Sequence, residues 1–195
     1  MDFKIISFYT NDWEYPAHAN RLKEECELLG LDYCIEERPS TTDYIKNTAI
    51  KPFFIRDCIE KFKQPVIWID VDALILKPIN FVIDADIHAC KHKNSHVSRE
   101  WAVAFLAFNY TPNSLNFINA WCNHSNKGTD ENAFELAWQE LKDCVEFKTL
   151  PSVYHFVKWS NSLEIPEDTI ICHQLSKFED KLRRKSGGKL NESAE

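Results

Sequence analysis

The chain has 195 residues and a mass of 22.8 kDa, carries a net charge of −7, and is 44% hydrophobic and 13% aromatic. This content suits one globular domain with a sizeable core and excludes disorder for most of the chain, while no apolar run approaches the about 20 residues of a membrane span. The acidic balance argues against a nucleic-acid binder, and seven widely spaced cysteines indicate a reducing compartment, so we expect a soluble, unsecreted, cytoplasmic protein.

Two strand–helix units precede a third strand in the first half of the chain. Residues 3–9 form a β-branched and aromatic run typical of a buried strand, and apolar side chains at helical spacing predict a helix within residues 16–30. Residues 31–35 predict a second strand, and Pro52 begins a second helix. The continuous apolar run Val66–Ile69 is typical of a central strand covered on both faces. This order predicts half of a doubly wound α/β fold, in which ligands bind beyond the carboxyl ends of the strands.

The second half of the chain is less regular, and its pattern alternates between short strands and two helices. The expected strands are residues 86–90, 101–108, 145–149 and 169–173, and the expected helices are residues 112–124 and 130–143. The polar segment 181–195 predicts a tail or a linker. We therefore expect a single domain over residues 1–180.

Two aspartates directly follow the buried third strand, at the edge where a ligand is expected. Asp70 and Asp72 lie one residue apart, so their carboxylates repel each other unless a cation is present. Carboxylate oxygens suit Mg²⁺ or Mn²⁺, and such an ion can also bridge to a diphosphate. The simpler alternative is a solvated turn, because polar residues collect at strand ends. The pair predicts a divalent metal site.

Three segments in order, residues 51–55, 65–75 and 104–109, make the chain resemble the small nucleotide-diphospho-sugar glycosyltransferases of the GT-A fold. The Asp-x-Asp motif of that family corresponds to residues 70–72. With the opening residues 7–10, the chain is particularly similar to glycosyltransferase domains of large algal (chlorella) viruses, over about residues 3–178.

The resemblance implies an α/β, GT-A-like fold whose mixed central sheet is flanked by helices. It also implies a metal-dependent glycosyltransferase with Mn²⁺ or Mg²⁺ as cofactor. Such an enzyme moves a sugar from a nucleoside-diphosphate donor, here most simply a UDP-sugar, to a hydroxyl of a glycan or glycoconjugate acceptor. If the chain is viral, the expected compartment is the host cytoplasm.

The resemblance also assigns roles to the metal-site residues. It implies that Asp72 binds the metal directly, that Asp70 contacts metal-bound water or the donor ribose, and that a late histidine, His173, is a further ligand. Lys177 would meet the β-phosphate, although a related branch carries a Gly and a Lys-Pro-Trp after this histidine where this chain has Gln-Leu-Ser-Lys-Phe. A lone histidine beside a strand is otherwise a hydrogen-bonded core or surface residue, so that alternative stays open.

Donor recognition is expected at the loop that follows the first strand. Tyr9 and Thr10 lie where a nucleobase would meet the end of the first strand, and Tyr15 could stack on that base. Asn47 and Lys51 could reach the ribose or a phosphate. Ordinary loop polarity and core aromatics explain these residues equally well.

An acceptor hydroxyl needs a base if the anomeric centre inverts, and a carboxylate suits that role. Asp130 and Glu131, at the expected start of a helix, are the candidates for the base or for a sugar-binding residue, and the sequence does not separate them. Acidic residues in a first helical turn are also ordinary cap chemistry. An acceptor-side rim could include His92, His96, Arg99 and Trp101.

Two other functions remain open at the level of sequence. A haloacid-dehalogenase-like phosphatase would use Asp70 as nucleophile and Asp72 as acid/base, but its motif lies on an early strand, and Leu74 stands where that family has Thr or Val. A nucleotide-sugar binding module without turnover is the second alternative.

Overall fold

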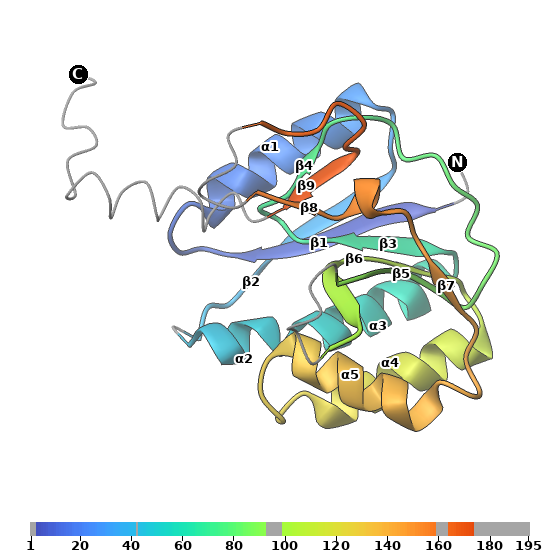
Figure 1. Ribbon diagram of the computed structural model, residues 1–195. Helices are drawn as coiled ribbons and strands as arrows, with labels where there is room; N and C mark the ends of the chain where they lie inside the picture. The colour runs from blue at the N-terminus through green and yellow to red at the C-terminus, as the bar shows by residue number, and fades with distance from the viewer. Residues whose placement is uncertain (1–2, 42, 93–98, 159–163, 174–195) are drawn as a thin grey trace, which may run out of the picture.

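A mixed six-stranded sheet organises the chain (Figure 1), and the structure, a computed structural model, describes residues 3–41, 43–92, 99–158 and 164–173. The strand order is β2-β1-β3-β6-β5-β7, and β6 runs antiparallel to both β3 and β5. The strands are β1 (Lys4–Thr10), β2 (Tyr33–Arg38), β3 (Val66–Ile69), β5 (Ile87–Lys91), β6 (Trp101–Phe108) and β7 (Phe147–Thr149). The carboxyl ends of β1, β3 and β5 therefore lie at one edge, together with the amino end of β6.

Helices cover both faces of this sheet. In Figure 1, α1 lies on one face, while α3, α4 and α5 lie on the other. The helices are α1 (Tyr15–Leu28), α2 (Tyr44–Thr48), α3 (Lys51–Phe62), α4 (Pro112–His124) and α5 (Asp130–Leu141). A second sheet, of order β4-β9-β8, lies on the α1 side and consists of β4 (Leu74–Ile75), β9 (Ile171–His173) and β8 (Phe156–Val157), with a short 3-10 helix, η1 (Ser152–Tyr154), before β8.

The helix ends follow from local sequence. Pro52 stands in the first turn of α3, where a missing backbone N–H costs nothing, and Lys63 ends that helix in the left-handed region with φ 52°. Thr111 caps α4 by accepting a hydrogen bond from the backbone N–H of Ser114. Gly30, at φ 63°, lets the chain leave α1 for β2.

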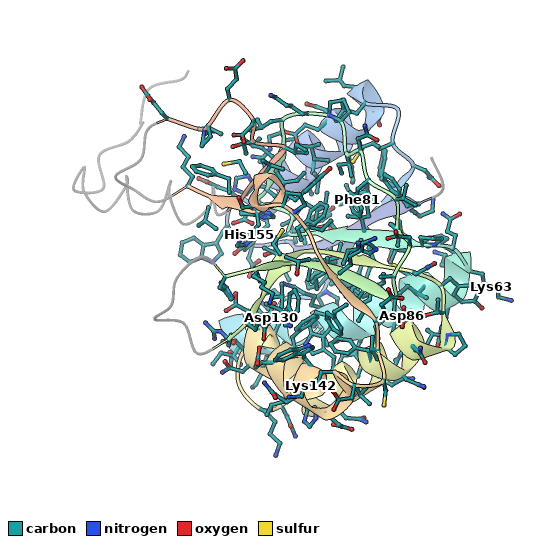
Figure 2. All side chains as sticks on the ribbon, turned by 45° about the vertical axis from the view of Figure 1, so that its right-hand side comes forward. Lys63, Phe81, Asp86, Asp130, Lys142 and His155 are labelled. Atoms are coloured by element: carbon teal, nitrogen blue, oxygen red, sulfur yellow. The ribbon has the colours of Figure 1, made fainter. Side chains whose placement is uncertain are left out.

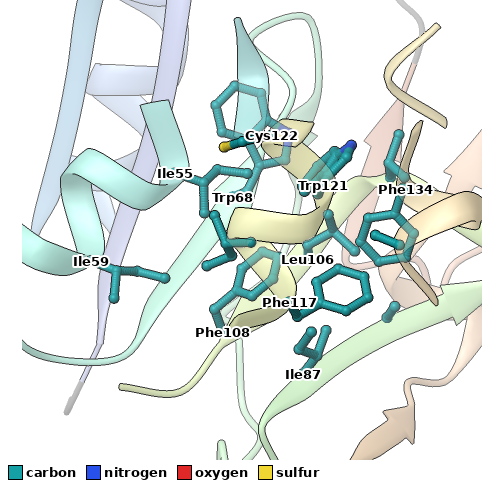
Figure 3. Packing of buried hydrophobic residues seen from close by; sticks show 14 of the residues in the cluster. Ile55, Ile59, Trp68, Ile87, Leu106, Phe108, Phe117, Trp121, Cys122 and Phe134 are labelled. Atoms are coloured by element: carbon teal, nitrogen blue, oxygen red, sulfur yellow. The ribbon is translucent and has the colours of Figure 1, made fainter. Parts of the chain in front are cut away.

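Two hydrophobic clusters hold the layers together, and β3 belongs to both. Val66 and Trp68 point into the cluster shared with α3, α4 and α5, whereas Ile67 and Ile69 point into the cluster shared with α1. Figure 3 shows Trp68 in the first of these clusters with aromatic rings from β6 and α4. Because both faces of β3 are buried, the polar residue that follows Ile69 is held at a fixed place on the sheet edge.

Most predicted elements are present, and the mixed central sheet agrees with the expected fold. The second strand begins at Tyr33 rather than at residue 31, several other elements begin or end one or two residues from their predicted bounds, and the sheet of β4, β8 and β9 was not predicted. Within the part of the chain that the structure describes, no helix has both the length and the apolar composition needed to cross a membrane.

Candidate active site

The two aspartates of the motif lie in a turn at the carboxyl end of β3. The backbone N–H of Asp70 donates to the carbonyl of Ala104 in β6 (3.0 Å), and the N–H of Ala73 closes the turn onto the carbonyl of Asp70 (2.9 Å). The indole N–H of Trp68 donates to Oδ1 of Asp70 at 2.8 Å. A tryptophan inside the apolar run, which the sequence marks only as core, thus fixes the first carboxylate of the motif.

Lys51 joins this motif to the start of α5. Its Nζ lies 2.9 Å from Oδ1 of Asp70 and 2.5 Å from Oδ2 of Asp130, and it also donates to the carbonyl of Val103 at 3.4 Å. The side chains of Lys51 and Asp130 are only 6% and 8% exposed, against 32% for Asp70. The structure therefore places the Lys51 ammonium between two carboxylates, where the sequence suggested contact with ribose or phosphate.

The charge of this lysine is stabilised by its two partners. Burial by itself lowers the pKa of Lys51, but the negative charges of Asp130 and Asp70 outweigh burial and hold that pKa above its ordinary value. Lys51 is therefore a permanent cation, and its two carboxylates are the counter-charges that make its burial possible.

Asp130 and Glu131, adjacent in the first turn of α5, face different surroundings. Asp130 contacts Lys51, and its backbone carbonyl accepts from the indole N–H of Trp121 at 3.0 Å. Glu131 is 31% exposed, and its Oε2 lies 2.9 Å from Nη2 of Arg99. The structure thus separates two residues that the sequence could not: Asp130 belongs to an internal charge network, and Glu131 is accessible.

Glu131 is surrounded by residues from the segment that connects β5 to β6. Arg99 also donates to the side chain of Asn132 at 2.9 Å, and Nε2 of His92 lies 3.9 Å from Oε1 of Glu131. Trp101 is a core residue, and His96 lies outside the described residues. Of the suggested acceptor-side rim, Arg99 and His92 therefore stand beside Glu131.

His173 ends β9 and is buried. Its Nε2 lies 3.3 Å from the carbonyl of Tyr154, whereas its Nδ1 has no hydrogen-bond partner among the residues that the structure describes. Burial lowers the pKa of His173 to about 4, and the charge of Lys51 acts in the same direction. The ring is therefore neutral at pH 7, and with its N–H given to Tyr154 it has a lone pair on Nδ1.

The chemistry of the donor atoms present is compatible with the predicted divalent ion. Asp72 offers carboxylate oxygens, and Nδ1 of His173, which has no hydrogen-bond partner in the described part of the chain, is a buried polar atom of the kind that a ligand would satisfy. Across the described ranges, no three His, Cys, Asp or Glu side chains converge closely enough to hold a metal by themselves.

His155 is a further histidine beside His92 and His173, and the sequence analysis did not single it out. His155 follows η1, and its ring centroid lies 4.9 Å from that of His173 and 6.3 Å from that of His92. Figure 2 shows His155 on the same side of the molecule as Asp130. No motif marks His155, because its place depends on how β8 pairs with β9.

Two of the predicted nucleoside-binding residues, Thr10 at the end of β1 and Asn47 in α2, flank loops that are hydrogen-bonded to each other. The hydroxyl of the buried Thr10 donates to Asp12, and the hydroxyl of Ser40 donates to the other oxygen of Asp12 at 2.6 Å. Asn47 accepts from the backbone N–H of Thr41 at 2.9 Å. Thr10 and Asn47 therefore shape these loops, and Asp12 is a connection that the sequence did not indicate.

The two aromatic candidates lie beside α1, and Lys177 lies outside the described residues. Tyr9 is half-buried under the ammonium of Lys23, which is 5.6 Å from its ring centroid, and Tyr15 begins α1 with its ring 6.5 Å from that of His18. Tyr9 is the penultimate residue of β1 and Tyr15 the first residue of α1, so both belong to the connection that follows the first strand.

The comparisons with known proteins bear on the fold. At the level of sequence, no family model and no curated protein matches the chain. Among solved structures, the chain is similar to a glycosyltransferase involved in the glycosylation of the major capsid of PBCV-1, with a TM-score of 0.67 and 14% identity over 94% of this chain and 100% of that one. At this identity the similarity concerns the fold, and the chain therefore has the mixed α/β, GT-A-like architecture of a viral glycosyltransferase that its sequence predicted.

Proposed function

We propose that the chain is a metal-dependent glycosyltransferase that moves a sugar from a UDP-linked donor to a hydroxyl of a glycan or glycoconjugate acceptor. The observation that carries the proposal is the placement of the aspartate motif, Lys51 and Asp130 in one charge network at the carboxyl edge of β3. The fold shared with a glycosyltransferase supports it. In α/β sheets this edge is where ligands bind.

The proposed metal ligands are the carboxylate of Asp72 and Nδ1 of His173, with Asp70 contacting the ion through water or contacting the ribose. When bound, Mn²⁺ or Mg²⁺ stabilises the negative charge of the departing diphosphate. The protein positions this ligand set through the turn that holds Asp72 and through Tyr154, which fixes the His173 tautomer.

We assign different roles to Asp130 and Glu131 in α5, because their side chains differ in exposure and in ion-pair partner. Glu131 is the accessible carboxylate, and Arg99 orients it, so Glu131 is suited to take the proton of an acceptor hydroxyl. Asp130 is paired with the buried ammonium of Lys51 and is suited to accept hydrogen bonds from the donor sugar.

Thermal unfolding with Mn²⁺ and a panel of nucleotides tests the proposal. We expect selective stabilisation by UDP that requires the metal and reaches about 2.7 kcal/mol at a hundredfold excess over Kd. Asp72→Ala should abolish this stabilisation, while Asp57→Ala, at an exposed position of α3, should retain it. Retained metal-dependent binding in Asp72→Ala would refute the assignment of Asp72.

Two further assays on the same protein distinguish the proposed function from the alternatives. Slow release of UDP from a UDP-sugar without acceptor distinguishes an enzyme from a binding module. Stabilisation by beryllofluoride with Mg²⁺, in place of UDP with Mn²⁺, would indicate a phosphatase that uses Asp70 as nucleophile.

A further inference from the structure

One face of α1 presents polar side chains to the segment that carries the aspartate motif. His18, Arg21 and Glu25 follow one another at spacings of three and four residues, so they share a face of the helix. Arg21 donates to the carbonyl of Ala73, and the backbone N–H of Ile75 donates to Glu25, each at 2.8 Å. Helix α1 is therefore attached to the chain immediately after Asp72.

The guanidinium of Arg21 makes three contacts in fixed directions. Its Nη2 holds the carbonyl of Ala73, its Nη1 lies 2.8 Å from Nδ1 of His18, and its Nε lies 3.4 Å from Oε1 of Glu25. The N–H of Ala73 is bonded to the carbonyl of Asp70, so Arg21 fixes the far end of the turn that contains Asp72. The two Nη groups of the planar fork therefore hold the carbonyl of Ala73 and Nδ1 of His18 at once, while Glu25 contributes an ion pair to Nε without a hydrogen bond in the described part of the chain.

The contact with Arg21 also determines where His18 carries its proton. A guanidinium has only donors, so Nδ1 of His18 accepts and the neutral ring is protonated on Nε2. Burial and Arg21 lower the pKa of this ring, while the nearby charge of Asp72 acts in the opposite direction. The neutral, buried imidazole is thus an acceptor that holds the guanidinium of Arg21 in place.

We propose that Arg21 is a positioning residue for Asp72: Arg21 fixes the backbone of the Asp70–Ala73 turn, and His18 holds the guanidinium of Arg21 toward that turn by accepting its hydrogen bond. The inference deepens the proposed function and rests on it, since it gives Asp72 its orientation as a metal ligand. Groups behind a metal ligand set its orientation and basicity, and their loss weakens metal binding without touching the ion.

The test is a Mn²⁺ titration of the purified protein at saturating UDP, read as the rise in Tm. His18→Phe, which keeps a ring but removes the acceptor of Arg21, should raise the half-saturating Mn²⁺ concentration about 10- to 100-fold. His18→Gln keeps an amide oxygen that can accept from Arg21, so its value should stay within about threefold of the unsubstituted protein.

Arginine substitutions extend the comparison. Arg21→Met should raise the half-saturating Mn²⁺ concentration as His18→Phe does, whereas Arg56→Met, which removes an arginine paired with Asp57 on the surface of α3, should not change it. Where Arg21→Met fails to fold, the two His18 variants decide.

The outcomes separate this inference from the proposed function. If the unsubstituted protein shows no Mn²⁺-dependent UDP binding, the proposed function fails, and the inference fails with it. If the protein binds but His18→Phe leaves the half-saturating Mn²⁺ concentration unchanged, or His18→Gln is as impaired as His18→Phe, the positioning role alone is overturned. A lower Tm of the metal-free variant with unchanged Mn²⁺ dependence shows a purely structural role and also overturns it.

Discussion

Replacing Lys51 by methionine tests the charge network on which the site is built. Methionine keeps much of the length and apolar volume of the lysine stem, so the substitution mainly removes the cation between Asp70 and Asp130. The two carboxylates then lose a shared partner in a region that excludes most water. We expect a large loss of stability, because an unpaired buried charge costs more than the pair contributed.

The magnitude follows from the exposure of each partner. Asp130 is nearly as buried as Lys51, and breaking a buried pair by removing one partner costs about 3–5 kcal/mol of unfolding free energy. Asp70 is about one third exposed, so water screens its charge and it adds little. For a chain of this size the loss corresponds to a decrease in Tm of roughly 6–20 °C.

Urea unfolding of a double-mutant cycle measures the effect. Lys51→Met with Asp130→Asn removes both buried charges, so the double variant should be about 2 kcal/mol more stable than the sum of the single losses implies. Lys46→Met is the matched control, because Lys46 is exposed and its Nζ lies 3.9 Å from Asp43. A loss below about 1 kcal/mol for Lys51→Met, or additive single effects, would refute the reasoning.

Three further predictions concern other positions. Burial lowers the pKa of His88 below its ordinary 6.5, so the unfolded state binds protons more strongly than the folded state. The unfolding free energy should therefore fall as the pH falls below 6.5, and it should fall less steeply in His88→Gln; an equal slope in both proteins would contradict this prediction. Asp86→Ala leaves the N–H of Glu146 without its acceptor and should cost about 1–3 kcal/mol in urea unfolding, which an unchanged midpoint would contradict. Trp68→Phe removes the hydrogen bond to Asp70 and should weaken Mn²⁺-dependent UDP binding by roughly 3- to 10-fold in the thermal assay, whereas binding of equal strength would show that the bond does not matter.

The elements predicted best are those that carry their own signals. Strand β3, strand β6 and helix α4 match the expected ranges, because continuous apolar runs and a proline-marked helix start are local features. Strand β2 extends to Arg38, beyond the predicted end, because an edge strand tolerates the polar pair Glu36 and Glu37. Strands β4 and β8 have two residues each, too few for any periodicity, and both pair with the distant β9.

The same distinction applies to the candidate site. Asp70 and Asp72 were identified because they follow a strand that its continuous apolar run predicts. The partners of Lys51 come from three distant parts of the chain, so no local pattern predicts them. Neighbouring helical residues point about 100° apart, so Asp130 and Glu131 had to differ. Which of the two faces Lys51 depends on how α5 packs against β6, and the sequence does not contain that information locally.

The structure also changes the argument for a metal at this edge of the sheet. The sequence suggested that a cation relieves repulsion between Asp70 and Asp72, but the charge of Asp70 is already balanced by Lys51. The case for a divalent ion therefore rests on Asp72 together with Nδ1 of His173, which has no hydrogen-bond partner among the residues that the structure describes. It follows that the two aspartates should respond differently: removing the carboxylate of Asp70 takes one of two counter-charges from Lys51 and should lower the unfolding free energy modestly, while removing that of Asp72 should act mainly on metal-dependent binding. A metal titration and an unfolding curve of Asp70→Asn and Asp72→Asn would show this separation, and equal effects of both variants on both measurements would contradict it.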